Sequence, residues 1–119
     1  DKVLLDIPCS GWGVFQKKAE LRWQKNQEMK ELIKLQKKAL EHGAKFLRPG
    51  GVMVYSTCTL NKEENEAQIE RFLSRNLDFT LESAEQFIQK EYTENGYLKT
   101  LPFKHNSDGA FAARIRKNI

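Results

Sequence analysis

The sequence predicts an α/β fold in which a parallel βαβ unit is followed by a helix and by antiparallel terminal strands. Two short apolar runs, at 3–5 and 52–54, have the length and composition of buried strands. The stretch between them carries apolar residues at helical spacing over its second half. A strand, a helix and a strand in this order pair in parallel with a right-handed crossover, so the first half of the chain is predicted to be one βαβ unit.

The first strand is expected at 2–6, followed by a glycine-containing loop at 7–14. Residues 15–25 follow no clean period and stay ambiguous. Asn26 can cap a helix that runs to about residue 47. The apolar residues of that helix fall on one broad face: Met29, Leu32, Ile33, Leu40 and Leu47.

Residues 48–51, Arg-Pro-Gly-Gly, are expected to end this helix and turn the chain into a strand at 52–57. Asn61 is predicted to cap the next helix, and Glu64, three residues on, completes a pattern like a capping box. The apolar side of this second helix is supplied by Ala67, Ile69, Phe72 and Leu73.

The remainder of the chain is predicted to be mainly strand. Candidates lie at 79–81, 97–101 and 110–115, the last one entered through the turn-forming residues 106–109. The glutamate-containing stretch at 82–96 is expected to form an exposed helix or an insertion loop. These strands are predicted to extend the same sheet in antiparallel fashion.

Composition and charge limit the possible functions. No apolar run approaches the roughly 18 residues that a membrane span needs, and no signal-peptide pattern is present, so we expect a cytoplasmic protein. The net charge is +4, and the basic clusters suit an anionic partner such as RNA, with a solvated surface as the alternative. These clusters are Lys17, Lys18, Arg22 and Lys25; Lys37 and Lys38; and Arg114, Arg116 and Lys117. Because the chain starts at Asp1 almost directly in a strand, we expect it to be part of a longer protein.

The two cysteines, Cys9 and Cys58, each follow a predicted strand. A cysteine in this position is ordinarily a small buried apolar residue. Here, however, Pro8 ends the first strand sharply, and Asn61 as a helix cap would place Cys58 near the positive end of a helix dipole, which favours thiolate. The carboxyl ends of neighbouring parallel strands meet at one crevice, so a two-thiol active site is predicted. No metal site is expected, because His42 and His105 lie far from both cysteines in the sequence.

Two motifs carry a resemblance to a known family. Residues 6–11, Asp-Ile-Pro-Cys-Ser-Gly, and 56–59, Ser-Thr-Cys-Thr, resemble the paired motifs of the Sun (RsmB-like) family of RNA 5-methylcytosine methyltransferases. Residues 47–51, 61–66 and 108–114 are also similar to that family's pattern, so the resemblance covers essentially the whole chain. It implies the C-terminal part of a Rossmann-like methyltransferase sheet that uses S-adenosylmethionine. Residues 1–119 would then be the C-terminal half of the catalytic domain, without the half that carries the cofactor loop.

The resemblance also implies roles for individual residues. Cys58 matches the nucleophile that attacks carbon 6 of cytosine, and Cys9 matches the cysteine that assists product release. Asp6 and Pro8 match the residues that contact the cofactor, S-adenosylmethionine. The implied partner is RNA, with ribosomal RNA the common substrate among relatives and transfer RNA an alternative.

Without its preceding half, the strand at 2–6 would be an uncovered edge and one face of the sheet would lack its helices. We therefore expect the isolated fragment to bind the cofactor weakly and to self-associate through its exposed apolar face. Two other functions stay open at this point. One is an RNA-binding module that kept the fold but not the chemistry; the other is a thiol redox protein that uses Cys9 and Cys58.

Overall fold

The structure, a computed structural model, describes residues 1–7, 25–59, 61–100 and 109–119. Two of the predicted site residues, Pro8 and Cys9, lie outside these ranges. So do most of the predicted loop at 7–14 and most of the turn at 106–109.

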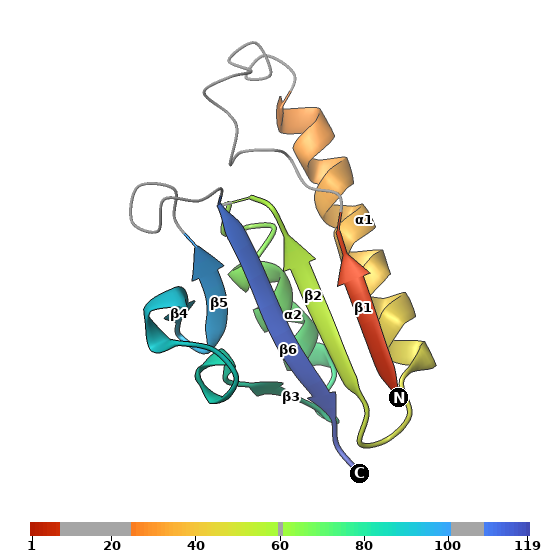
Figure 1. The fold of residues 1–119 in the computed structure, drawn as a ribbon. Coiled ribbons are helices and arrows are strands. Elements are labelled where there is room, and N and C mark those ends of the chain that lie inside the picture. The colour runs from red at the N-terminus through yellow and green to blue at the C-terminus, as the bar shows by residue number, and fades with distance from the viewer. Residues whose placement is uncertain (8–24, 60, 101–108) are drawn as a thin grey trace.

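One mixed sheet forms the centre of the described chain (Figure 1), with the strand order β1-β2-β6-β5-β4 and with β3 also paired to β6. The first strand is parallel to the second, and the last strand is antiparallel to it. The strands are β1 (Lys2–Asp6), β2 (Val52–Thr57), β3 (Phe79–Glu82), β4 (Thr93–Glu94), β5 (Tyr97–Thr100) and β6 (Ala110–Lys117). The predicted α/β class, with its βαβ unit and antiparallel terminal strands, is confirmed.

The long strand β6 holds the second half of the sheet together. One of its edges pairs with β2, while the other pairs with β5 near residues 110–112 and with β3 near residues 114–117. The predicted strands at 79–81, 97–101 and 110–115 therefore all exist, and the last of them continues to Lys117.

Both helices, α1 (Lys25–Phe46) and α2 (Glu66–Arg75), cover the same face of the sheet (Figure 1). Alternate residues of β2 and β6 point toward the two helices and are almost completely buried. The helices contribute apolar residues from their inner sides. The core includes Met53, Tyr55, Phe111, Ala113 and Ile115 from the sheet, and Leu40, Ile69 and Phe72 from the helices.

The other face of the sheet carries no helix of the described chain. Leu4 projects from this face of β1 with 72% of its surface exposed, and β1 is the outermost strand of the described sheet. An uncovered edge strand with an apolar side chain is what the sequence predicts for the strand at 2–6.

Neither predicted helix cap is confirmed. The described part of the first helix already includes Lys25, so Asn26 lies within the helix instead of capping it. The second begins at Glu66 and not directly after Asn61; residues 62–65 form turns in which the amides of Glu64 and Asn65 bond to carbonyls three residues back. In the turns before α2, the Glu64 carbonyl accepts a hydrogen bond from the hydroxyl of Tyr55 instead of from a helical amide.

The stretch at 82–96 is an insertion loop with short regular pieces and no α-helix. It contains two 3₁₀ turns, η3 (Ala84–Gln86) and η4 (Lys90–Tyr92), followed by the hairpin of β4 and β5. Asn95 and Gly96 connect these strands with φ values of 53° and 90°. Asn-Gly is the dipeptide that favours this left-handed two-residue hairpin turn.

Candidate active site

The carboxyl ends of β1 and β2 lie side by side. Asp6 is in register with Ser56, and the amide of Ile7 donates a 2.9 Å hydrogen bond to the carbonyl of Ser56. The chain therefore leaves β1 next to the point where β2 approaches Cys58. Ligands of open α/β sheets bind at this edge.

Asp6 is exposed at this edge. The Ser56 hydroxyl lies 3.5 Å from one oxygen of the Asp6 carboxylate and 3.5 Å from the carbonyl of Leu5, both at the long limit of hydrogen bonding. The Asp6 carboxylate is thus only weakly engaged by Ser56 and is accessible to a cationic group.

Cys58 is the first residue beyond β2, and it is exposed. Its two neighbours are buried: Thr57 is 5% exposed and Thr59 is fully buried. The chain therefore presents the thiol to the surface between two side chains that point inward. This placement disfavours the interpretation of Cys58 as a small core residue.

The predicted effect of a helix dipole on Cys58 is wrong. The helix that follows begins at Glu66, well beyond Cys58, because residues 61–65 form turns before it. A helix dipole acts mainly within the first turn, so it does not act on this thiol.

Asn61 and Glu64 do pair, but not as a helix cap. The Asn61 side-chain oxygen accepts a hydrogen bond from the amide of Glu63 at 3.2 Å, and its nitrogen donates to Glu64 Oε2 at 2.9 Å. The pair closes a turn ahead of the helix. The Asn-x-x-Glu spacing thus predicts the contact correctly and the helix start incorrectly.

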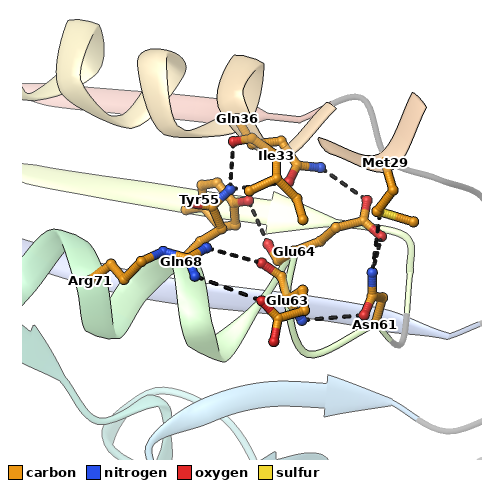
Figure 2. A network of polar contacts seen from close by, with 9 residues as sticks. All are labelled: Met29, Ile33, Gln36, Tyr55, Asn61, Glu63, Glu64, Gln68 and Arg71. Atoms are coloured by element: carbon orange, nitrogen blue, oxygen red, sulfur yellow. Dashed lines mark hydrogen bonds and ion pairs between the residues drawn. The ribbon is translucent and has the colours of Figure 1, made fainter. Parts of the chain in front are cut away.

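Glu64 is the centre of a buried polar network between β2, α1 and α2 (Figure 2). Its side chain is fully buried, and Oε1 accepts a 3.0 Å hydrogen bond from Gln36 of α1. The hydroxyl of Tyr55 donates to the Glu64 backbone carbonyl at 2.6 Å. Gln68 extends the network by donating to the carbonyl of Ile33 at 2.8 Å. A carboxylate removed from water needs such donors, so the network ties the turn at 61–65 to both neighbours.

Sequence reasoning missed three residues of this region: Gln36, Asn65 and Gln68. Each is at most 1% exposed. The available signal is helical spacing, because Gln36 stands four residues from both Leu32 and Leu40 on the apolar side of α1. Buried polar side chains at such positions need partners, but the sequence does not say which.

The basic residues of the C-terminal cluster, at 114, 116 and 117, form hydrogen bonds and ion pairs with other parts of the chain. Arg114 and Arg116 donate to the two oxygens of Glu82, at 2.8 Å and 2.6 Å. The hydrogen bonds from Arg116 and then Arg114 lower the pKa of Glu82. Lys117 donates to the carbonyl of Leu47. These contacts reduce the charge that this cluster can offer to an anionic partner, whereas Lys17, Lys18 and Arg22 lie outside the described residues.

Among the residues that the structure describes, no group of three His, Cys, Asp or Glu side chains could hold a metal ion. Within the same ranges, neither helix has the length and apolar character needed to cross a membrane.

Comparison with known proteins agrees with this arrangement. A family model described as 16S rRNA methyltransferase RsmB/F matches residues 1–116. The chain belongs to the RsmB/F family. Ribosomal RNA small subunit methyltransferase B of Shewanella oneidensis is 37% identical over 118 residues, which are 98% of this chain and 27% of that relative.

Solved structures similar to this RsmB/F chain share its fold. The crystal structure of PH0851 superposes with a TM-score of 0.84 at 36% identity, over 98% of this chain and 26% of that one. NSun6 from Pyrococcus horikoshii, solved with SFG, has a TM-score of 0.75 at 33% identity, over 96% of this chain and 29% of that one. The chain thus spans about a quarter of the length of the relatives it matches, and its sheet is part of a Rossmann-like methyltransferase fold.

Proposed function

We propose that residues 1–119 are the C-terminal half of the catalytic domain of an RNA methyltransferase. The parent enzyme transfers a methyl group from S-adenosylmethionine to carbon 5 of cytosine in RNA, with ribosomal RNA as the favoured substrate over transfer RNA. Membership of the RsmB/F family supports the proposal. The observation that carries it is the exposed thiol of Cys58, presented beyond β2 beside the end of β1.

The proposed role of Cys58 is nucleophilic catalysis. Carbon 5 of cytosine is a poor nucleophile. The Cys58 thiolate forms a bond to carbon 6, and the electron pair of the carbon 5–carbon 6 double bond makes carbon 5 nucleophilic. S-adenosylmethionine, when bound, supplies the electrophilic methyl group that carbon 5 takes up.

The methylated adduct must then be resolved. A base removes the proton from carbon 5, the double bond re-forms, and the bond between carbon 6 and sulfur breaks to return Cys58 as thiolate. The resemblance to the family assigns assistance in this release to Cys9, which lies outside the described residues. Cys58 and Cys9 therefore have different expected consequences when each is removed.

Asp6 is proposed, with Pro8, to contact the cofactor. An exposed carboxylate at the carboxyl end of β1, only weakly engaged by Ser56, can pair with the ammonium of an amino acid moiety. Asp6 would thus orient the cofactor beside the end of β2. The greater part of the cofactor pocket is expected outside residues 1–119.

RNA recognition must bring a base out of its stack. Carbon 6 of cytosine is accessible to a thiol only when the base is single-stranded or flipped. The exposed position of Cys58 suits a base that enters from the carboxyl edge of the sheet.

The test uses the full-length parent protein with cytosine-containing RNA and S-adenosylmethionine. Cys9→Ala and Cys58→Ala variants are incubated with both substrates and analysed on a denaturing gel. We expect a covalent protein–RNA complex to accumulate in Cys9→Ala and to be absent from Cys58→Ala. Absence of the complex from both variants, with RNA binding retained, would contradict the proposal in favour of an RNA-binding role.

A further inference from the structure

Cys58 lies just beyond the end of β2, after the residues that pair with β1 and β6. An exposed residue just past a strand ordinarily has considerable freedom. A nucleophile, by contrast, gains rate from being held in one geometry relative to its target.

The side chain of Asn65 bridges the two neighbours of Cys58. Its oxygen accepts a 2.6 Å hydrogen bond from the hydroxyl of Thr57, and its nitrogen donates a 2.9 Å hydrogen bond to the backbone carbonyl of Thr59. One amide therefore holds the chain on both sides of the exposed thiol.

Both of these hydrogen bonds are shielded from water. Asn65 and Thr59 are fully buried, and Thr57 is 5% exposed. Breaking either bond would leave a buried polar group without its partner, which costs about 1 to 3 kcal/mol. The bridge is therefore expected to stay closed in the folded protein.

Asn65 makes this bridge instead of capping its own helix. It occupies the N-cap position of α2, where asparagine is among the favoured residues, yet its side chain makes no capping hydrogen bond. The amide is directed back toward the exit of β2. This use of the side chain indicates that its main contribution is to the Cys58 segment.

The turn that precedes Asn65 is itself held in place by hydrogen bonds. Glu64, directly before Asn65, is held through its side chain by Gln36 and Asn61 and through its carbonyl by Tyr55 (Figure 2). The Thr59 hydroxyl in turn accepts from the amide of Asn61 at 3.2 Å. Residues 57–59 and 61–65 are thus linked to each other and held against β2 and α1.

We propose that Asn65 is a positioning residue that, together with the Thr57 hydroxyl, fixes the Cys58 thiol for addition to the base. This inference rests on the proposed role of Cys58 as nucleophile. Asn65 does not touch the substrate; it acts through the backbone on either side of Cys58. Its loss should slow the chemical step while leaving RNA affinity nearly unchanged.

The test compares two substitutions at one position in the full-length parent protein. Thr57→Val removes the hydroxyl and keeps the shape, whereas Thr57→Ser keeps the hydroxyl. We expect Thr57→Val to lower the single-turnover rate of methyl transfer about tenfold to a hundredfold. The dissociation constant of Thr57→Val for RNA should stay within about threefold of that of the original protein. Thr57→Ser should retain most of the original rate. Asn65→Ala should resemble Thr57→Val.

Gln68→Met supplies the matched structural control. It removes a buried amide of the same network, which bonds to the carbonyl of Ile33 and to Gln36 on α1. We expect it to lower thermal stability but to leave the single-turnover rate nearly unchanged. Equal losses of rate in Thr57→Val and Gln68→Met would show general destabilisation and overturn the proposal.

A second readout follows the thiol itself. The rate of alkylation at Cys58, measured by mass spectrometry of its peptide across a range of pH, should change in Thr57→Val and Asn65→Ala but not in Gln68→Met. Unchanged alkylation and methyl transfer in both bridge variants would overturn the positioning role while leaving the proposed function intact. Methyl transfer that persists in Cys58→Ala would instead refute the nucleophile assignment, and the positioning role with it.

Discussion

The ammonium group of Lys99 on β5 lies 2.7 Å from a carboxylate oxygen of Glu66 in the first turn of α2. Both side chains are largely buried, at 12% and 18% exposure, and Glu94 adds a second carboxylate 3.2 Å from the same ammonium. The pair links the helical layer to the second half of the sheet. Because both partners are shielded from water, it resembles a buried ion pair more than a surface one.

Removing the ammonium group of Lys99 should therefore lower the stability of the fold. Lys99→Met retains the aliphatic stem but leaves the Glu66 carboxylate without its cation. We expect the free energy of unfolding to fall by about 2 kcal/mol. Chemical denaturation of the purified protein measures this change, with the exposed Lys34→Met as the control that should stay within about 0.5 kcal/mol of the original protein. Equal effects of the two substitutions would contradict the assignment.

The same pair predicts a dependence on alkaline pH. Burial acts to lower the pKa of Lys99, but hydrogen bonds to Glu66 and Glu94 outweigh it, and the pKa is raised above 10.5. A raised pKa in the folded state stabilises the fold below the unfolded-state pKa, and that contribution disappears as pH rises through the folded value. The stability difference between the original protein and Lys99→Met should be constant near neutral pH and shrink above about pH 10.5.

The ion pairs of Glu82 with Arg114 and Arg116 lead us to expect that the stability of the fold decreases at acid pH. Hydrogen bonds from Arg116 and Arg114 lower its pKa below 4.5, so its contribution is present above that pH and is lost as pH falls through the folded value. Glu82→Gln should lower the stability of the fold at neutral pH. Below about pH 4.5, the variant should lose less stability on further acidification than the original protein does. Thermal unfolding across acid pH checks this, with the exposed Glu85→Gln as control. An acid profile unchanged by Glu82→Gln would count against it.

Gly43 allows α1 to pack closely on β1 and β2. A Cβ at this position would lie 3.0 Å from the sulfur of Met53 and 3.1 Å from a methyl carbon of Leu5. Gly43→Val should lower the free energy of unfolding by about 1 to 3 kcal/mol through overpacking. Glu41→Val, at an exposed position of the same helix, is the control for a β-branched residue in α1 that causes no overpacking. The explanation fails if the two valine variants unfold at the same denaturant concentration.

Leu4 is the expected centre of self-association when residues 1–119 are expressed alone. It is 72% exposed on the outermost strand of the described sheet. Unpaired strand edges with apolar side chains favour association between copies. Sedimentation of the fragment should show dimers or larger species that Leu4→Lys reduces. A monomeric fragment at high micromolar concentration would refute this expectation.

The isolated fragment should also bind S-adenosylmethionine weakly. Asp6 and Pro8 supply only part of the expected contacts, and the greater part of the pocket is expected outside the chain. Calorimetric titration of the fragment checks this point, with the full-length parent as the positive control. A dissociation constant in the micromolar range for the fragment alone would contradict the prediction.

The element pattern was predictable because it depends on local information. Apolar runs identified β1 and β2, helical spacing identified α1, and the order of these elements implied parallel pairing. The Asn95-Gly96 dipeptide is an equally local signal, because it favours the two-residue hairpin turn that connects β4 to β5. For the site, the sequence placed Cys58 correctly beyond the end of β2.

The partners of buried polar groups were not predictable from local information. Asn61 and Asn65 both suit a helix cap, yet Asn65 occupies the cap position and directs its amide to Thr57 and Thr59. Arg114 and Arg116 belong to a basic cluster that suits either an anionic partner or a solvated surface, yet Glu82 neutralises part of that charge from a strand over thirty residues away. Such choices depend on which donors and acceptors the fold brings together.

The sequence alone therefore determined the order and type of the elements outside 82–96, the face of each helix that is buried and the two cysteine motifs, because hydrophobic periodicity and turn chemistry act over a few residues. Only the tertiary structure decided where α2 begins, what Glu64 and Asn65 bind, and how Cys58 is held. Those outcomes depend on contacts between β2, α1 and the turn before α2. A buried polar group must find partners wherever the folded chain places them.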